Sequence, residues 1–207
     1  MNFIRKVFRC SENKFFAVLF ASVALLLTIA WLVYCIIAVG ASFFTFTNVW
    51  NYFVLFLIYG CLLIYNIRND NRAYTAISLL LFAAIIGSFI DVIYDLVSLF
   101  RAGWGTGSLL ILPIMALDIL IIVVAVFAFI QLNTYRIGRT SDYKKVRLWL
   151  ILFAVVVVLP SVVNYFIYLG MGEATTAWFV LVTALASEFA SLCAAVSAVF
   201  TFNRLIR

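Results

Sequence analysis

The sequence predicts an all-α integral membrane protein, a six-helix transmembrane bundle with its N- and C-termini in the cytoplasm. Of its 207 residues, 68% are hydrophobic and 11% are charged, whereas a soluble globular domain has about 45–50% apolar and about 25% charged residues. Many side chains of a small domain lie near its surface, so this excess of apolar residues must face something other than water. The composition therefore favours a lipid bilayer as the environment.

The first two spans follow from a long uncharged stretch. Between Lys14 and Arg68 there is no Asp, Glu, Lys or Arg, and one bilayer crossing needs only about 20 apolar residues. We expect spans at about 15–39 and 49–67, with Tyr52 at the membrane interface. The first apolar run is 25 residues long, whereas the apolar region of a signal peptide has about 7–15 residues. We therefore expect the first helix to be retained.

Polar segments divide the rest of the chain into four further spans. Two of these segments carry clear signals: three glycines and a tryptophan lie in 101–107, and five basic residues lie in 133–147. Shorter polar breaks occur at 68–72 and 170–176. The four spans are expected at about 73–100, 108–132, 148–169 and 177–202. Together the six spans form one membrane domain, residues 15–203, between a basic N-terminal segment, 1–14, and a short tail, 204–207.

The basic residues predict the orientation. If the N-terminus is cytoplasmic, the opposite side holds only Arg101, and the cytoplasmic segments hold the other thirteen basic residues, which is the bias expected of cytoplasmic loops. The thirteen are Arg5, Lys6, Arg9, Lys14, Arg68, Arg72, Arg136, Arg139, Lys144, Lys145, Arg147, Arg204 and Arg207. Contact with anionic membrane lipids accounts for the net charge of +6, so no nucleic-acid partner is expected. Other membrane subunits or a second copy are possible partners, and the cell membrane is the expected location.

Four carboxylates lie inside the apolar spans: Asp91, Asp95, Asp118 and Glu188. A charged side chain at the centre of a bilayer costs about 2.5–3.5 kcal/mol on insertion scales, so each should face the inside of the bundle. At about 1.5 Å per residue, Asp118 and Glu188 lie near the midplane, and Asp91 and Asp95 lie closer to the outer end of the third span. No Lys or Arg lies deep enough to neutralise them, although Arg101 could reach Asp95. They are therefore either largely protonated or bound to a cation.

Two functional interpretations remain open for these acids. In the favoured one, Asp91, Asp95, Asp118 and Glu188 line an outward-facing cavity with Asn164 and bind or transport a cation, a proton or a small cationic solute. Pro160 would free backbone carbonyls for that site. In the alternative, each protonated acid donates a hydrogen bond between helices, a bond that contributes only about 0.6 kcal/mol on average. The protein is then a non-catalytic structural, adhesion or accessory subunit of a membrane complex.

An enzyme is not expected. Asp91-Val-Ile-Tyr-Asp95 resembles the end of the metal-binding motif of membrane alcohol phosphotransferases, but the aspartates, glycine and arginine that precede it in that motif are missing. The chain has no His, no Gly-x-Ser-x-Gly and no phosphate-binding glycine loop. We therefore predict no catalytic residue, no metal site and no cofactor. Cys10 lies among basic residues just before the first span and is a possible lipidation site.

Overall fold

The computed structural model describes residues 12–39, 49–102, 111–138, 142–170 and 174–206. Within these residues the chain forms helices and short turns and contains no strand, so the predicted all-helical class is confirmed. Four helical segments of the described part are long and apolar enough to cross a membrane: Glu12–Ile37, Ala73–Arg101, Ile111–Arg136 and Tyr143–Ile167.

The first predicted span is α2 (Glu12–Val39), and the second consists of a short π-helix, η2 (Val49–Val54), that continues into α4 (Leu55–Arg68). A tight turn ends α4. Asn69 adopts the left-handed conformation, with φ 56°, which asparagine tolerates better than most residues. The backbone N–H of Asp70 then donates to the carbonyl of Tyr65 over 3.0 Å. This turn leads directly into the next helix.

The next helices, α5 (Ala73–Ala102) and α7 (Ile111–Arg136), are followed by α8 (Tyr143–Val156). Both ends of the segment 133–147, which the sequence predicts to be a polar connection, are therefore helical. Asp142 explains the early start of α8, because its side chain accepts a hydrogen bond from the backbone N–H of Lys145 over 3.4 Å. An aspartate at this position satisfies a free donor of the first helical turn.

The fifth predicted span is broken in its middle. Helix α8 ends at Val156, and α9 (Leu159–Gly170) begins after a two-residue turn. Pro160 is the physical cause, since it has no N–H to donate to the carbonyl of Val156 and its ring crowds the preceding turn. Helix α10 (Ala174–Leu205) completes the chain.

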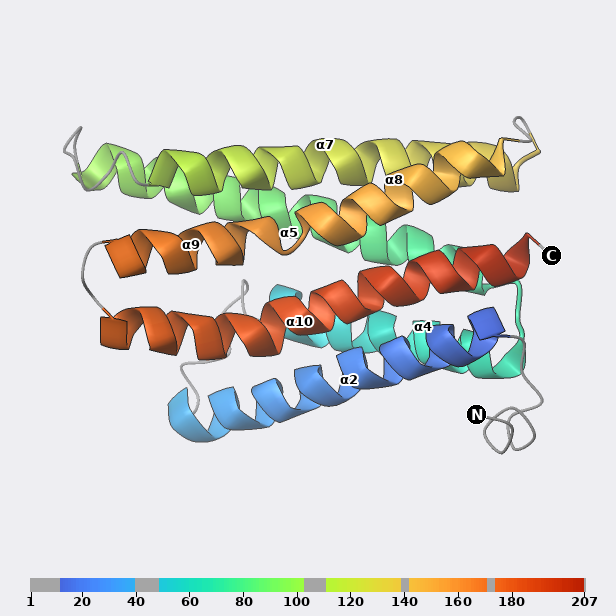
Figure 1. Ribbon diagram of the computed structural model, residues 1–207, viewed down its shortest axis with the longest axis horizontal. Coiled ribbons are helices and arrows are strands. Elements are labelled where there is room, and N and C mark those ends of the chain that lie inside the picture. Colours follow the sequence, from blue (N-terminus) through green and yellow to red (C-terminus); the bar gives the residue numbers. More distant parts are fainter. Residues whose placement is uncertain (1–11, 40–48, 103–110, 139–141, 171–173, 207) are drawn as a thin grey trace.

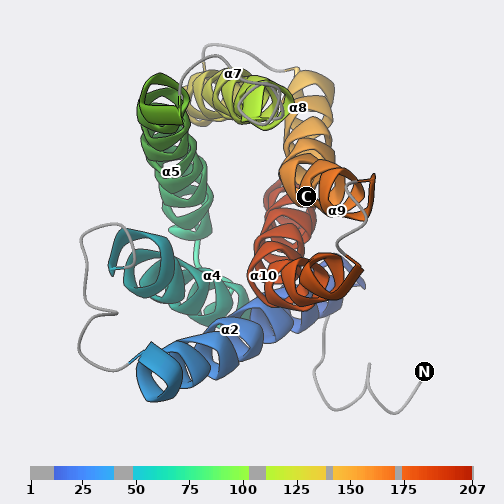
Figure 2. The ribbon, with the colours of Figure 1, turned by 90° about the vertical axis from the view of Figure 1, so that its left-hand side faces the viewer.

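The helices form a closed ring in chain order. Each packs against the next, from α2 through α4, α5 and α7 to α8 and α9, and α10 packs along both the α8–α9 pair and α2. Figure 2 shows this ring from one end. The start of α2 and the end of α10 lie at the same end of the bundle, together with the α4–α5 and α7–α8 connections (Figure 1). We call this end, which carries Arg68, Arg72, Arg136, Lys144, Lys145, Arg147 and Arg204, the basic end.

The interior near the basic end is densely packed. Phe202 is fully buried and makes edge-to-face contacts with Tyr74 and Tyr135, at ring-centre distances of 6.3 and 5.5 Å. Buried Asn66 of α4 donates to the Thr201 hydroxyl of α10 over 2.8 Å. These contacts join α4, α5, α7 and α10, so this half of the bundle leaves little space between its helices.

Arg204 closes the same end by binding the end of α4. Its guanidinium donates to the carbonyl of Asn66 over 3.2 Å and to the side-chain oxygen of Asn69 over 3.1 Å. Burial lowers the pKa of Arg204, and the negative charge of Asp70 opposes that shift. The carbonyls at the end of α4 thus obtain a charged donor, as helix C-termini favour.

The outward surfaces of the helices are apolar. Large hydrophobic side chains are exposed on every long helix, including Leu26, Ile37, Phe89, Phe100, Phe127, Val155 and Phe166. A continuous apolar exterior of this kind is typical of a surface that contacts lipid or another protein.

Candidate functional site

The half of the bundle away from the basic end encloses a cavity of about 240 Å³, and side chains from every helix of the ring line it. A second cavity, of about 300 Å³, lies between α5, α7, α9 and α10. Asp91, Asp118, Pro160 and Glu188 line both, so the two spaces share a wall. We refer to them together as the acidic cavity.

The structure brings together all five residues that the sequence singled out. Asp91, Asp118 and Glu188 line both parts of the acidic cavity, and Asp95 and Asn164 line the second part. Asp91 and Asp95 are four residues apart and therefore share one face of α5. That a ligand binds them stays a prediction.

Asp118 is the least exposed of these acids. Asp118 is only 7% exposed as a residue, although it lines both parts of the acidic cavity. Within the described residues, its carboxylate makes no hydrogen bond and no ion pair. A buried carboxylate without a partner is unfavourable, so this position favours a positively charged ligand or a bound proton.

Glu188 is held differently. It lies in the interior of α10, and the Ser161 hydroxyl of α9 lies close to its carboxylate at the wall of the cavity. Since Ser161 directly follows Pro160, the break between α8 and α9 places this donor beside the acid. The helix break therefore helps to build the site.

Among the residues that the structure describes, no basic side chain balances these acids. Neither part of the acidic cavity is lined by Lys or Arg. Arg101 lies at the end of α5, and no ion pair joins it to Asp95, both of them within the described part of the chain. The contact between Arg101 and Asp95 that the sequence allowed is therefore not formed.

The acids are spread along the cavity wall. Among the described residues, no group of three or more cysteine, aspartate or glutamate side chains lies close enough to hold a metal ion. The arrangement thus offers carboxylates at several depths of one cavity. Cys10, the possible lipidation site, lies outside the described residues.

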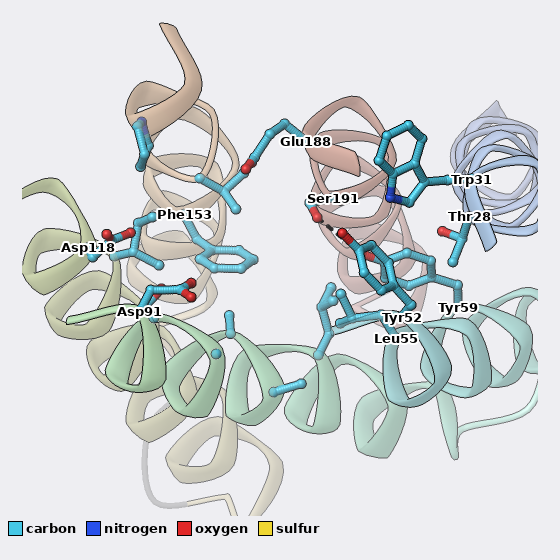
Figure 3. A pocket seen from close by; sticks show the side chains of 18 residues that line it. Thr28, Trp31, Tyr52, Leu55, Tyr59, Asp91, Asp118, Phe153, Glu188 and Ser191 are labelled. Carbon is cyan, nitrogen blue, oxygen red and sulfur yellow. Dashed lines mark hydrogen bonds between the residues drawn. The ribbon is translucent and has the colours of Figure 1, made fainter. Parts of the chain in front are cut away.

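Aromatic rings form the other side of the cavity. Trp31 from α2, Tyr52 from η2 and Tyr59 from α4 line it, and Figure 3 shows these rings opposite the carboxylates of Asp91 and Asp118. Tyr59 is nearly fully buried, and its hydroxyl lies 3.3 Å from the hydroxyl oxygen of Ser191. This pair joins α4 to α10 beside the cavity.

The side chain of Tyr52, which the sequence predicts at the membrane interface, lines the cavity. Sequence reasoning also missed Trp31. A signal for Trp31 was present in the stripe of small residues Ala17, Ala21, Ala24 and Thr28 on α2, all of which are buried. Continued by one turn, that face leads to Trp31.

Comparison of the chain with protein-family models, with curated proteins and with solved structures finds no match.

Proposed function

We propose that this chain is a six-span protein of the cell membrane that binds a cation, a proton or a small cationic solute in the acidic cavity and moves it across the membrane. The observation that carries the proposal is the meeting of Asp91, Asp95, Asp118, Glu188 and Asn164 at one cavity, with no Lys or Arg among the described residues that line it. Carboxylates that lie within an apolar bundle and lack a counter-charge are poised to accept a positive ligand.

The proposed topology has both termini and the basic end in the cytoplasm. It is supported by the arrangement of the helices, since the connections with the basic residues lie at the same end as the start of α2 and the end of α10. Lys and Arg accumulate in cytoplasmic segments. The six spans are then α2, η2 with α4, α5, α7, α8 with α9, and α10.

The proposed access is from the outer side. Near the basic end, Leu62, Asn66, Leu132, Leu150 and Phe202 are all buried, so the described part of the chain is closely packed there. The second part of the acidic cavity adds residues that lie toward the opposite end of the bundle, among them Asp95 and Asn164. A solute would therefore reach the carboxylates from outside.

Uptake measurements on proteoliposomes test the function. We expect the wild-type protein to take up protons, sodium or methylammonium faster than protein-free liposomes do, and Asp118→Asn and Glu188→Gln to abolish that uptake at normal protein abundance. Asp70→Asn is the matched control, because it removes the same charge at the basic end and should leave uptake unchanged. No uptake by the wild type, combined with lower abundance of the cavity variants, would favour the structural or accessory role instead.

Cysteine labelling tests the topology separately. In a background without native cysteines, Lys144→Cys should react with a membrane-impermeant maleimide only after the cells are opened. Arg101→Cys should react in intact cells. Labelling of position 144 in intact cells would overturn the proposed orientation.

A further inference from the structure

We infer that the acidic cavity binds an organic ammonium ion with an apolar body, whose nitrogen lies at Asp118 and whose apolar part lies against Trp31 and Tyr52. This inference rests on the proposed binding of a cation and specifies its chemical class.

The Asp118 carboxylate is the first feature that favours an ammonium ion. Asp118 is nine-tenths buried, lines both parts of the cavity and makes no hydrogen bond or ion pair with the described residues. An ammonium group supplies what this carboxylate lacks, a positive charge that donates hydrogen bonds. Charge-assisted hydrogen bonds of this kind are about twice as strong as neutral ones.

The aromatic side of the cavity is the second feature that favours an organic ammonium ion. Trp31 and Tyr52 pack together against the small cluster of Leu32 and Cys35, and both line the cavity. Aromatic rings cover apolar groups and also attract cations to their faces, tryptophan most strongly. An inorganic ion would use only the acidic side, whereas an organic ammonium ion would contact both sides.

The volume of the cavity also fits an organic ammonium ion. The first part of the cavity measures about 240 Å³, and one water molecule takes about 30 Å³ in the liquid. The space therefore holds a small organic molecule, and it exceeds what one dehydrated metal ion fills. Hydroxyl groups of Thr28, Ser88 and Ser191 also line it and can orient polar groups of such a ligand.

Calorimetric titration of the full-length protein in lipid nanodiscs tests the inference. The probes are phenethylammonium, its neutral analogue 2-phenylethanol, and sodium. We expect phenethylammonium to bind at least about tenfold more tightly than 2-phenylethanol, because only the ammonium ion pairs with Asp118. We expect sodium to bind more weakly than phenethylammonium.

Substitutions on the acidic side and on the aromatic side of the cavity locate the bound ligand. Asp118→Asn should abolish the preference for phenethylammonium over 2-phenylethanol. Trp31→Leu and Tyr52→Leu should each weaken phenethylammonium binding by about fivefold to thirtyfold, the loss expected for one aromatic–cation contact. Tyr52→Phe keeps the ring and should bind nearly as the wild type does. Trp149→Leu is the matched control, since Trp149 stacks on Phe127 and lines neither part of the cavity.

The outcomes separate this inference from the proposed function. Binding of sodium or protons that depends on Asp118, without binding of phenethylammonium, would overturn the inference and leave the proposed function standing. Absence of binding for every cation would overturn both. Phenethylammonium binding that Trp31→Leu and Tyr52→Leu leave unchanged, in variants that keep the wild-type helix content and elution volume, would overturn the assignment of the aromatic side.

Discussion

Replacing Asp118 by Asn should change stability and ligand binding in opposite directions. Asp118 is 7% exposed as a residue, and its carboxylate makes no hydrogen bond or ion pair with the described residues. On insertion scales, an aspartate at the centre of a membrane helix costs about 2.5–3.5 kcal/mol. Asparagine keeps one unpaired polar group, and such a group costs about 1–3 kcal/mol when buried. The difference predicts that Asp118→Asn raises the free energy of unfolding of the unliganded protein by about 1 kcal/mol.

Bound ligand should make the wild type more stable than Asp118→Asn. A ligand at 100 times its Kd stabilises the native state by about 2.7 kcal/mol. The wild type should gain this stabilisation from phenethylammonium, and Asp118→Asn should lose most of it. With saturating ligand, the wild type is therefore expected to be the more stable of the two proteins.

Unfolding in detergent micelles, followed by circular dichroism with and without phenethylammonium, measures both effects. Asp70→Asn is the control. The backbone N–H of Arg72 donates a hydrogen bond to the Asp70 carboxylate over 2.8 Å, and the amide oxygen of the introduced asparagine side chain can still accept it. This variant should stay within about 0.5 kcal/mol of the wild type, as surface substitutions usually do, and should keep the full ligand effect. The reasoning is refuted if Asp118→Asn destabilises the unliganded protein or remains fully stabilised by the ligand.

Three further predictions concern the parts of the fold that surround the cavity. Phe202→Ala should lower the free energy of unfolding by about 3–5 kcal/mol, because the ring is fully buried; a loss below 1 kcal/mol in micelle unfolding would contradict the packed basic end. A double-mutant cycle of Asn66→Ala and Thr201→Ala should give a coupling energy of about 0.6–1.7 kcal/mol from their hydrogen bond, and zero coupling would count against it. Pro160→Ala should restore the N–H missing at the helix break and bring α8 and α9 into one helix. Spin labels on the two helices should then move apart and phenethylammonium should bind more weakly, whereas unchanged distances would show that the break does not depend on proline.

The sequence supported the helical fold and the acidic site for a physical reason. Carboxylates such as Asp118 and Glu188 are too costly in lipid to lie anywhere but inside the bundle, so their presence in apolar spans predicts a shared interior. Their meeting with Asn164 at one cavity follows from that rule. The regular spacing of Asp91 and Asp95 predicts their common face in the same way.

The aromatic side of the cavity could not be predicted with the same reasoning. Tyr52 lies near the start of its span, where tyrosine commonly marks the interface, and only the packing of η2 against neighbouring helices turns it inward. The contact between α2 and α10, which closes the ring of helices, could not be predicted either. It joins residues that lie far apart in the chain, such as Phe16 and Phe200, whose ring centres are 5.1 Å apart. Local sequence patterns do not reveal such pairs.

The packing difference between the two halves of the bundle has an electrical consequence. With the proposed access from outside, the acidic cavity is filled by the outer solution, whereas the half around Asn66 and Phe202 is filled with side chains. The membrane potential then falls mainly across the filled half, because a conducting solution carries little of the voltage drop. A cation bound at Asp118 has crossed little of the field, and its release into the cytoplasm would gain most of the about 2.3 kcal/mol per charge that 100 mV provides. Voltage would therefore drive the inward step and leave binding nearly unaffected.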